Sequence, residues 1–199
     1  MPAQAIFTGN DYTAAFARRG KIKPYEHMLT SNDATQAFSS LGDLPYVSED
    51  VFKQLNKYTC EIYGTKKNRN ETDNVDKKRV LMLRAKIPKR GKNVLKKLKS
   101  FDPVSLPPCA NVLMQKTVRT NFVAHIWKNA HKQEIPQWDP CDHGWTVEND
   151  LLVPVWYTGE RVPEQLYHED EEEDEDDSDD EDPTSDSESE SDEEDSDED

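Results

Sequence analysis

Residues 48–64, Ser-Glu-Asp-Val-Phe-Lys-Gln-Leu-Asn-Lys-Tyr-Thr-Cys-Glu-Ile-Tyr-Gly, decide the fold class of this chain. Ser48 is a favoured N-cap residue, the two acids after it suit the positive end of a helix dipole, and Gly64 suits the C-cap. Apolar side chains recur between these caps at helical spacing, at Val51, Phe52, Leu55, Tyr58, Ile62 and Tyr63. The stretch therefore predicts an amphipathic helix over about residues 49–63.

Helical patterns also flank this segment on both sides. Before it, Asn32 and Asp33 suit the start of a helix that Gly42 would end. After it, apolar residues follow a helical spacing over about residues 109–131, the longest such pattern in the chain. The expected apolar face consists of Leu113, Met114, Val118, Phe122, Ile126, Trp127 and Ala130. We therefore expect a mainly α-helical protein.

The folded part is expected to end in irregular chain or short β segments. Residues 136–163 are rich in Trp and Pro, and residues 151–156 are the best candidate for a strand. Two interpretations of the Trp residues are open. In the first, Trp145 and Trp156 pack over the long helix that carries Trp127 and help to build the core. In the second, these Trp residues form a functional site.

Charge divides the chain into a basic body and an acidic tail. The sequence holds 41 Asp and Glu against 25 Lys and Arg, for a formal net charge of −16. Of these acids, 23 lie in residues 169–199, which contain no Lys or Arg, so the part before them holds 18 acids and carries +7. Such a tail lacks the apolar content that offsets ordering entropy. We expect a disordered tail over 166–199, a helical domain over 46–165 and a separate segment over 1–45.

A basic linker is expected over residues 65–100, because Lys and Arg outnumber Asp and Glu there by 14 to 3. Its cationic clusters are Lys77, Lys78, Arg79, Lys89, Arg90, Lys92, Lys96 and Lys97. These clusters suit nucleic-acid phosphates or a nuclear-import signal, and the alternative is a solvated helix face. Aromatic residues that could stack on bases are absent from the run, so any binding of nucleic acid is expected to be electrostatic and salt-sensitive.

The acidic tail is compatible with several roles. It could cover the chain's own basic segment, bind basic partners such as histones, or keep the protein in solution. Six serines in it have an acid three residues on, which suits acid-directed kinases. These expected phosphorylation sites are Ser178, Ser185, Ser187, Ser189, Ser191 and Ser196.

Membrane insertion and secretion are not expected. The sequence has no run of 18 or more apolar residues and no signal-peptide pattern. Its cysteines, Cys60, Cys109 and Cys141, are odd in number and far apart, so we expect reduced thiols in the nucleus or the cytoplasm, with the nucleus favoured. A zinc site is not favoured, because no two ligands have the short spacing typical of structural zinc.

Two resemblances to known families bear on function. Residues 7–12, Phe-Thr-Gly-Asn-Asp-Tyr, resemble a metal-binding turn of flap-endonuclease-like nucleases of the PIN-like superfamily. This resemblance implies that Asp11 is a ligand of a divalent metal. It also implies that the following basic segment, with Arg18, Arg19 and Lys21, contacts duplex phosphates. The alternative from the residues themselves is that Asp11 caps a turn through its side chain.

The second resemblance covers about residues 6–165. A group of animal proteins associated with mobile elements carries similar landmarks in the same order and with roughly the same spacing. In this sequence the landmarks fall at 7–11, 58–63, 106–108, 122–131, 144–145 and 153–156, and the fourth reads Phe-Val-Ala-His-Ile-Trp-Lys-Asn-Ala-His. The resemblance implies that the chain corresponds to the C-terminal half of such proteins, with residues 1–45 as the remnant of a nuclease-like domain.

Three functional hypotheses follow. The first is a non-catalytic or remnant nuclease-like protein of mobile-element origin that binds nucleic acid or basic nuclear proteins electrostatically. The second is a metal-dependent nuclease whose missing carboxylates come from an N-terminal part or a partner chain, because Asp11 alone cannot hold Mg²⁺ or Mn²⁺ for catalysis. The third is an acidic adaptor similar to a histone chaperone. No cofactor is expected from this chain alone.

Overall fold

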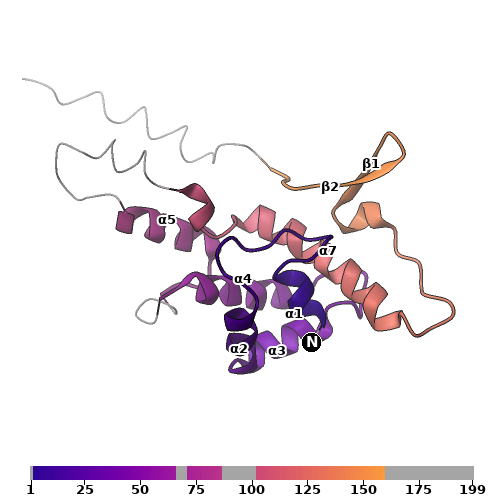
Figure 1. The fold of residues 1–199 in the computed structure, drawn as a ribbon, viewed down its shortest axis with the longest axis horizontal. Helices are drawn as coiled ribbons and strands as arrows, with labels where there is room; N and C mark the ends of the chain where they lie inside the picture. Colours follow the sequence, from indigo (N-terminus) through magenta and orange to yellow (C-terminus); the bar gives the residue numbers. More distant parts are fainter. Residues whose placement is uncertain (1, 66–70, 87–101, 160–199) are drawn as a thin grey trace, which may run out of the picture. The chain divides into compact units, whose positions relative to one another are not determined.

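Helices make up most of the described chain as far as Asn129, and a β-hairpin follows (Figure 1). The computed structural model describes residues 2–65, 71–86 and 102–159. Its elements in chain order are α1 (Pro2–Phe7), α2 (Ile22–Leu29), α3 (Asn32–Ser40), α4 (Glu49–Tyr63), α5 (Val75–Lys86), the short 3-10 helix η1 (Pro103–Ser105), α7 (Ala110–Asn129), a second 3-10 helix η2 (Pro140–His143), β1 (Trp145–Glu148) and β2 (Leu151–Pro154). The prediction of a mainly helical protein with short β segments near the end is confirmed.

Helix α4 begins and ends where its sequence predicts. The Ser48 hydroxyl accepts a hydrogen bond from the N–H of Val51 at 3.3 Å, and the N–H of Gly64 donates to the carbonyl of Glu61 at 3.1 Å. Both contacts satisfy backbone groups that a helix leaves free at its ends.

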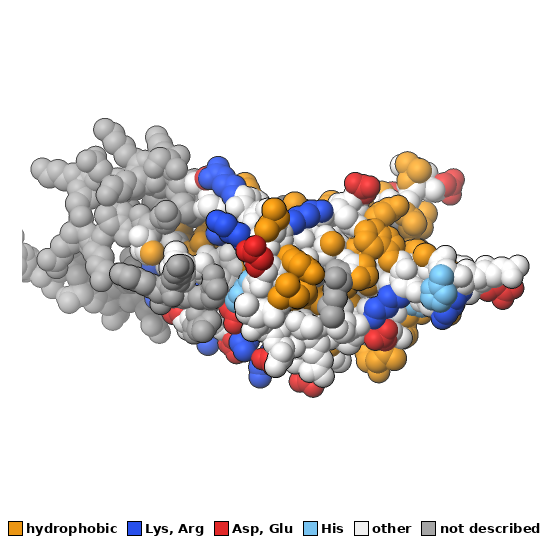
Figure 2. Space-filling model, turned by 60° about the horizontal axis from the view of Figure 1, so that its bottom comes forward, with side chains coloured by type: hydrophobic (Ala, Val, Ile, Leu, Met, Phe, Trp, Pro, Cys, Tyr) orange, Lys and Arg blue, Asp and Glu red, His pale blue; other side chains and the backbone are white. Residues whose placement is uncertain are grey.

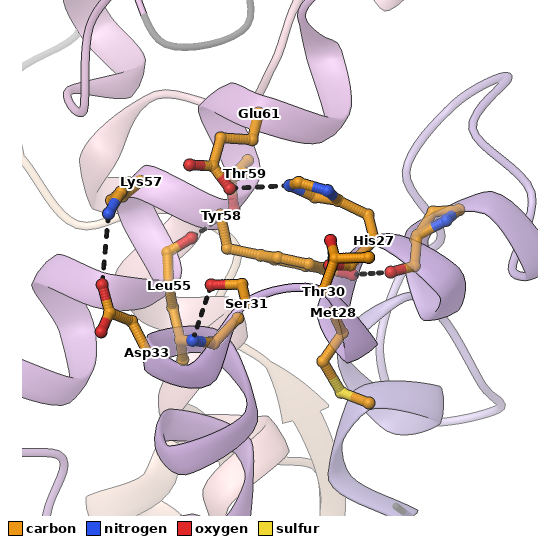
Figure 3. Close-up of polar contacts among 12 residues, drawn as sticks. His27, Met28, Thr30, Ser31, Asp33, Leu55, Lys57, Tyr58, Thr59 and Glu61 are labelled. Atoms are coloured by element: carbon orange, nitrogen blue, oxygen red, sulfur yellow. Dashed lines mark hydrogen bonds and ion pairs between the residues drawn. The ribbon is translucent and has the colours of Figure 1, made fainter.

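The N-cap of α3 (Asn32–Ser40) lies one residue before the expected capping residues. This N-cap is Ser31, whose hydroxyl accepts a hydrogen bond from the N–H of Ala34 at 3.3 Å (Figure 3). Asn32 and Asp33, the expected capping residues, are instead the first residues of the helix. The carboxylate of Asp33 lies 3.2 Å from the ammonium of Lys57 on α4.

An aromatic cluster forms the centre of the core. The ring of Phe7 lies 5.4 Å from that of Phe38, and the ring of Phe38 lies 5.1 Å from that of Tyr58, in edge-to-face arrangements. All three side chains are buried. Burial raises the pKa of the Tyr58 phenol to about 12, and its hydroxyl donates to the carbonyl of Pro24 at 2.8 Å. Helices α1, α2, α3 and α4 therefore share one core.

Residues 2–45 pack into the same core as the helices that follow them, through buried side chains such as Ile6, Phe7 and Phe38. The sequence pattern could not reveal this packing, because Phe7 and Tyr58 meet only in three dimensions. The expected acidic tail and its serines lie outside the described residues.

The buried face of α7 differs from the expected apolar face. Its buried residues are Leu113, Lys116, Thr117, Arg119, Thr120, Asn121, Val123, Ala124 and His125. Ile126 and Trp127, expected in the core, are 39% and 45% exposed. The polar face can be buried because its side chains find partners: the hydroxyls of Thr117 and Thr120 each donate at 2.8 Å to the carbonyl four residues earlier.

Strands β1 and β2 pair antiparallel, with Trp145 opposite Pro154 and Glu148 opposite Leu151. The two-residue connection is Asn149-Asp150, with φ of 50° and 62°. Positive φ at both positions is typical of the tight turns that fit the twist of a hairpin, and Asn and Asp tolerate it well. No helix among the described residues is long and apolar enough to cross a membrane.

Candidate functional site

The loop between α1 and α2 carries the expected metal-binding turn. Gly9 has a φ of 125°, and a Cβ at this position would lie 2.6 Å from the Cα of Ala15, so the close approach requires glycine. Asn10 Oδ1 accepts hydrogen bonds from the backbone N–H groups two and three residues on, at 3.0 and 2.9 Å. The side chain of Asn10 therefore closes this turn, which corrects the interpretation that Asp11 does so.

Asp11 is exposed on the same loop. Within residues 2–65, 71–86 and 102–159, its carboxylate belongs to none of the ion pairs, and no three His, Cys, Asp or Glu side chains could together hold a metal ion. Two-metal nuclease sites need several clustered carboxylates. A Mg²⁺ or Mn²⁺ site at Asp11 would therefore require ligands from outside the described residues.

Asp11 lines a pocket of about 630 Å³ that also involves α7 and the hairpin, here called the aromatic pocket. Trp127 on α7, Trp145 on β1 and Trp156 after β2 all line it. Trp127 and Trp156 are 45% and 53% exposed. The three Trp residues meet beside α7, as the packing interpretation expected, but two of them lie at the surface and not in the core.

Arg119 fixes the hairpin to α7. Its side chain is buried, and Nη1 donates hydrogen bonds to the carbonyl of Gly144 at 3.1 Å and to the carbonyl of Val155. The guanidinium carbon lies 5.1 Å from the centre of the Trp156 ring. Burial lowers the pKa of this guanidinium. Arg119 therefore holds the chain on both sides of the hairpin, at Gly144 and at Val155, and supports one wall of the aromatic pocket.

Lys116 lies one turn before Arg119 on α7 and is also buried. Its ammonium donates to the carbonyl of Ala14 and lies 4.6 Å from the centre of the Phe16 ring. Burial, and to a smaller extent the charge of Arg119, lower the pKa of Lys116 to about 7. This lysine was not among the functional candidates because its sequence neighbours give no sign that it is buried.

The expected phosphate-binding residues Arg18 and Arg19 line a second recess, of about 290 Å³, together with Lys23 and His27. We call it the basic recess. Arg18 pairs with Asp102 at 2.6 Å. Lys21, the third expected residue, is exposed and precedes α2, but it is not among the lining residues.

Two of the four basic side chains in this recess already have acidic partners. His27 Nε2 lies 2.7 Å from a carboxylate oxygen of Glu61 (Figure 3), and Arg18 has its own acid, as described above. In the described part of the chain, no carboxylate pairs with Arg19 or Lys23. The Arg19 guanidinium instead lies 4.3 Å from the centre of the Tyr63 ring. Arg19 and Lys23 therefore supply the uncompensated positive charge of the basic recess.

Three cations that are neighbours in the sequence of the basic linker have different surroundings in the structure. Lys77 is exposed on α5. The Lys78 side chain is fully buried, with its ammonium 3.8 Å from Glu71. Arg79 donates to the carbonyl of Pro107. Lys78 is thus a core residue and not the surface phosphate contact that its charge suggests. The other predicted contacts, Lys89, Arg90, Lys92, Lys96 and Lys97, lie outside the described residues.

A stack of three rings was not predicted. Trp138 lies between His125 and His143, with ring centres 3.6 and 5.2 Å apart and near-parallel planes. Both nitrogens of each histidine face backbone carbonyl oxygens: His125 those of Gly42 and Pro136, His143 those of Asp139 and Pro45, all at 2.7–3.1 Å. His125 thus ties two loops to α7, and His143 ties η2 to the loop at Pro45. The three cysteines are free thiols, as expected.

Comparison with known proteins gives no family for this chain: no protein-family model matches it, and searches of curated proteins and of solved structures found no match.

Proposed function

We propose that this chain is a non-catalytic, nuclease-like protein of mobile-element origin that binds the phosphate backbone of nucleic acid. The observation that carries the proposal is the basic recess, where two cations without acidic partners in the described chain, Arg19 and Lys23, lie beside Arg18 and His27. The order of the sequence landmarks supports the proposed origin.

The recess has the features that a phosphate site needs. The Arg19 guanidinium is held against the ring of Tyr63, which reduces the side-chain freedom that binding would remove. Lys23 lies in the first turn of α2, a helix with no acid in that turn and no side-chain cap at Lys21. A helix start of this kind favours anions, because free N–H groups and the helix dipole both point outward there.

The contact is expected to be electrostatic and independent of base sequence. Binding at two phosphates releases about two counterions, so the slope of log K against log salt should contain a contribution of about −2 from Arg19 and Lys23. Lys77 on α5 is a further exposed cation that can contribute to such binding. No base-specific contact is proposed.

The proposal is tested by fluorescence anisotropy with a labelled duplex at several salt concentrations. The double variant R19Q/K23Q should bind more weakly than the wild type and should show a smaller salt slope. The charge-matched control K53Q/K132Q changes two exposed lysines outside the basic recess and should keep most of the affinity. Equal losses in both double variants would contradict a specific recess.

A metal-dependent nuclease is the second candidate, favoured by the likeness of residues 7–12 to a nuclease turn. In that case the chain, or the chain with a partner that supplies carboxylates, would cleave flap or duplex DNA in Mg²⁺ or Mn²⁺, and D11N would abolish cleavage. Cleavage by the wild type that D11N abolishes would replace the non-catalytic proposal. The third possibility, capture of histones by the acidic tail, predicts a pull-down that is lost when residues 169–199 are deleted.

A further inference from the structure

The aromatic pocket lies apart from the basic recess and has the opposite chemistry. The side chains that define it for this argument are Asp11, Tyr12, Trp127, Trp145, Leu152 and Trp156. Tyr12 is 54% exposed, so the loop brings a further ring to the surface beside the Trp residues of α7 and the hairpin. The volume of about 630 Å³ lies in the range of small-ligand sites. The hairpin lies at the right of Figure 1, and Figure 2 shows hydrophobic side chains together toward the same side.

Among the described residues, Asp11 is the only charged side chain on the lining of this pocket. Its carboxylate is not part of any of the ion pairs found within residues 2–65, 71–86 and 102–159. Aromatic ring faces carry a negative electrostatic potential, and they attract cations within about 6 Å of the ring centre. A pocket lined by a carboxylate and several aromatic side chains therefore favours a positively charged ligand.

We propose that the aromatic pocket binds the N-methylated ammonium group of a lysine side chain on a partner protein. Methylation spreads the charge over apolar methyl groups, so the group loses less hydration on entering an apolar pocket than a primary ammonium does. The ring faces and Asp11 meet the charge. Leu152 and the neighbouring Pro154 provide apolar surface for the lysine stem.

The buried basic side chains of α7 bear on where in the pocket the ligand charge lies. The Arg119 guanidinium covers one face of Trp156, at 5.1 Å from the ring centre. Lys116 donates to the carbonyl of Ala14, a residue of the pocket lining. Because like charges repel, we place the ligand ammonium at Trp127 and at Tyr12, the residue after Asp11, and not at Trp156. The site is independent of the basic recess, because Arg18, Arg19 and Lys23 do not line this pocket.

The test compares three probes by tryptophan fluorescence and by NMR: a short peptide with trimethyl-lysine, the same peptide with unmodified lysine, and the same peptide with the neutral carbon isostere of trimethyl-lysine. The trimethyl-lysine peptide should bind about tenfold more tightly than the neutral isostere, which has the same shape. The peptide with unmodified lysine should also bind more weakly than the trimethyl-lysine peptide. Equal affinity for the trimethyl-lysine peptide and the isostere would overturn the proposal, as would no binding of any probe at millimolar concentration.

Two exposed positions provide variants that keep the fold. D11N should lower the affinity for the trimethyl-lysine peptide about three- to tenfold and leave the affinity for the isostere unchanged. W127L should abolish the preference for the charged probe. The matched control D73N removes an exposed acid that lines a different recess and should change nothing. Free choline tests the source of the ammonium group: affinity equal to that of the peptide would overturn the assignment to a protein side chain.

Discussion

Gly42 and Asn121 are joined by a hydrogen bond of 2.7 Å from the backbone N–H of Gly42 to Oδ1 of Asn121, across 79 residues of sequence. The side-chain Nδ2 of Asn121 donates a hydrogen bond to the carbonyl of Leu44 at 2.8 Å. One buried side chain of α7 thus satisfies backbone groups on both sides of the turn that follows α3. Gly42 lies so close to α7 that a Cβ would meet the backbone nitrogen of His125 at 2.7 Å.

The first prediction compares two glycines with positive φ. Gly42 has a φ of 88° and no room for a Cβ, whereas Gly20 has a φ of 61° with nothing within 4 Å of the added atom. G20A should therefore lower the free energy of unfolding only by the cost of a positive φ for alanine, about 1 kcal/mol. G42A should lower the free energy of unfolding by about 3 kcal/mol or more, because the added Cβ would also displace α7. Urea denaturation measures both, and equal losses would show that the contact with α7 does not matter.

The second prediction concerns the pH dependence of stability. The pKa of Lys116 is lowered to about 7 in the folded protein from 10.5, so the unfolded chain binds more protons between these values. The free energy of unfolding should therefore rise with pH from about 7 upward and be lowest below 7. K116M should be more stable than the wild type at pH 7 and should lack this rise, which is on the order of 2 kcal/mol between pH 7 and 9.

Because the titration of Tyr58 and Cys60 also changes stability with pH, the effect of Lys116 has to be measured as a difference between the wild type and K116M. Burial raises the pKa of Tyr58 and of Cys60 to about 12, so these groups lower stability as the unfolded chain loses their protons at high pH. Both groups are present in the wild type and in K116M. The difference between the two proteins, measured by thermal denaturation across pH 6–9, therefore isolates Lys116, and a difference that is constant with pH would contradict the prediction.

The third prediction concerns the attachment of the hairpin. R119M removes the donor to the carbonyls of Gly144 and Val155 but keeps an apolar side chain of similar length. Two-stranded hairpins are only marginally stable by themselves. Hydrogen exchange at the β1 and β2 amides should therefore become at least about tenfold faster, while exchange at the centre of α4 changes little. Equal acceleration at both places would indicate global destabilisation instead of local release.

The fourth prediction separates two adjacent lysines. K78A removes a fully buried side chain next to Glu71 and should lower the free energy of unfolding by about 2–4 kcal/mol. K77A changes an exposed side chain and should leave stability within about 0.5 kcal/mol. Chemical denaturation gives both values. If nucleic acid binds as proposed, K77A should weaken it, whereas K78A should not at temperatures where the variant is folded.

Local signals predicted three of the helices, α3, α4 and α7. The caps at Ser48 and Gly64 and the apolar repeat between them set the bounds of α4, because these contacts lie within one helix. The periodicity of α7 predicted its existence but not its buried face. Lys116 and Arg119 reach carbonyl oxygens far away in sequence, at Ala14 and at Val155, and such long-range partners leave no mark on local spacing.

The candidate sites show the same division. The sequence identified the loop of Asp11 and the cations Arg18 and Arg19, since turn residues and charge are local properties. It could not show that Lys78 is buried or that Lys23 and His27 complete the basic recess.

By itself, then, the sequence determined a mainly helical protein, because capping and hydrophobic spacing act within a few residues. Only the tertiary structure decided which charges are exposed and which are buried. It also brought Trp127, Trp145 and Trp156 to one pocket beside Asp11. The physical reason is that burial and convergence depend on contacts between segments distant in the chain, which neither composition nor periodicity encodes locally.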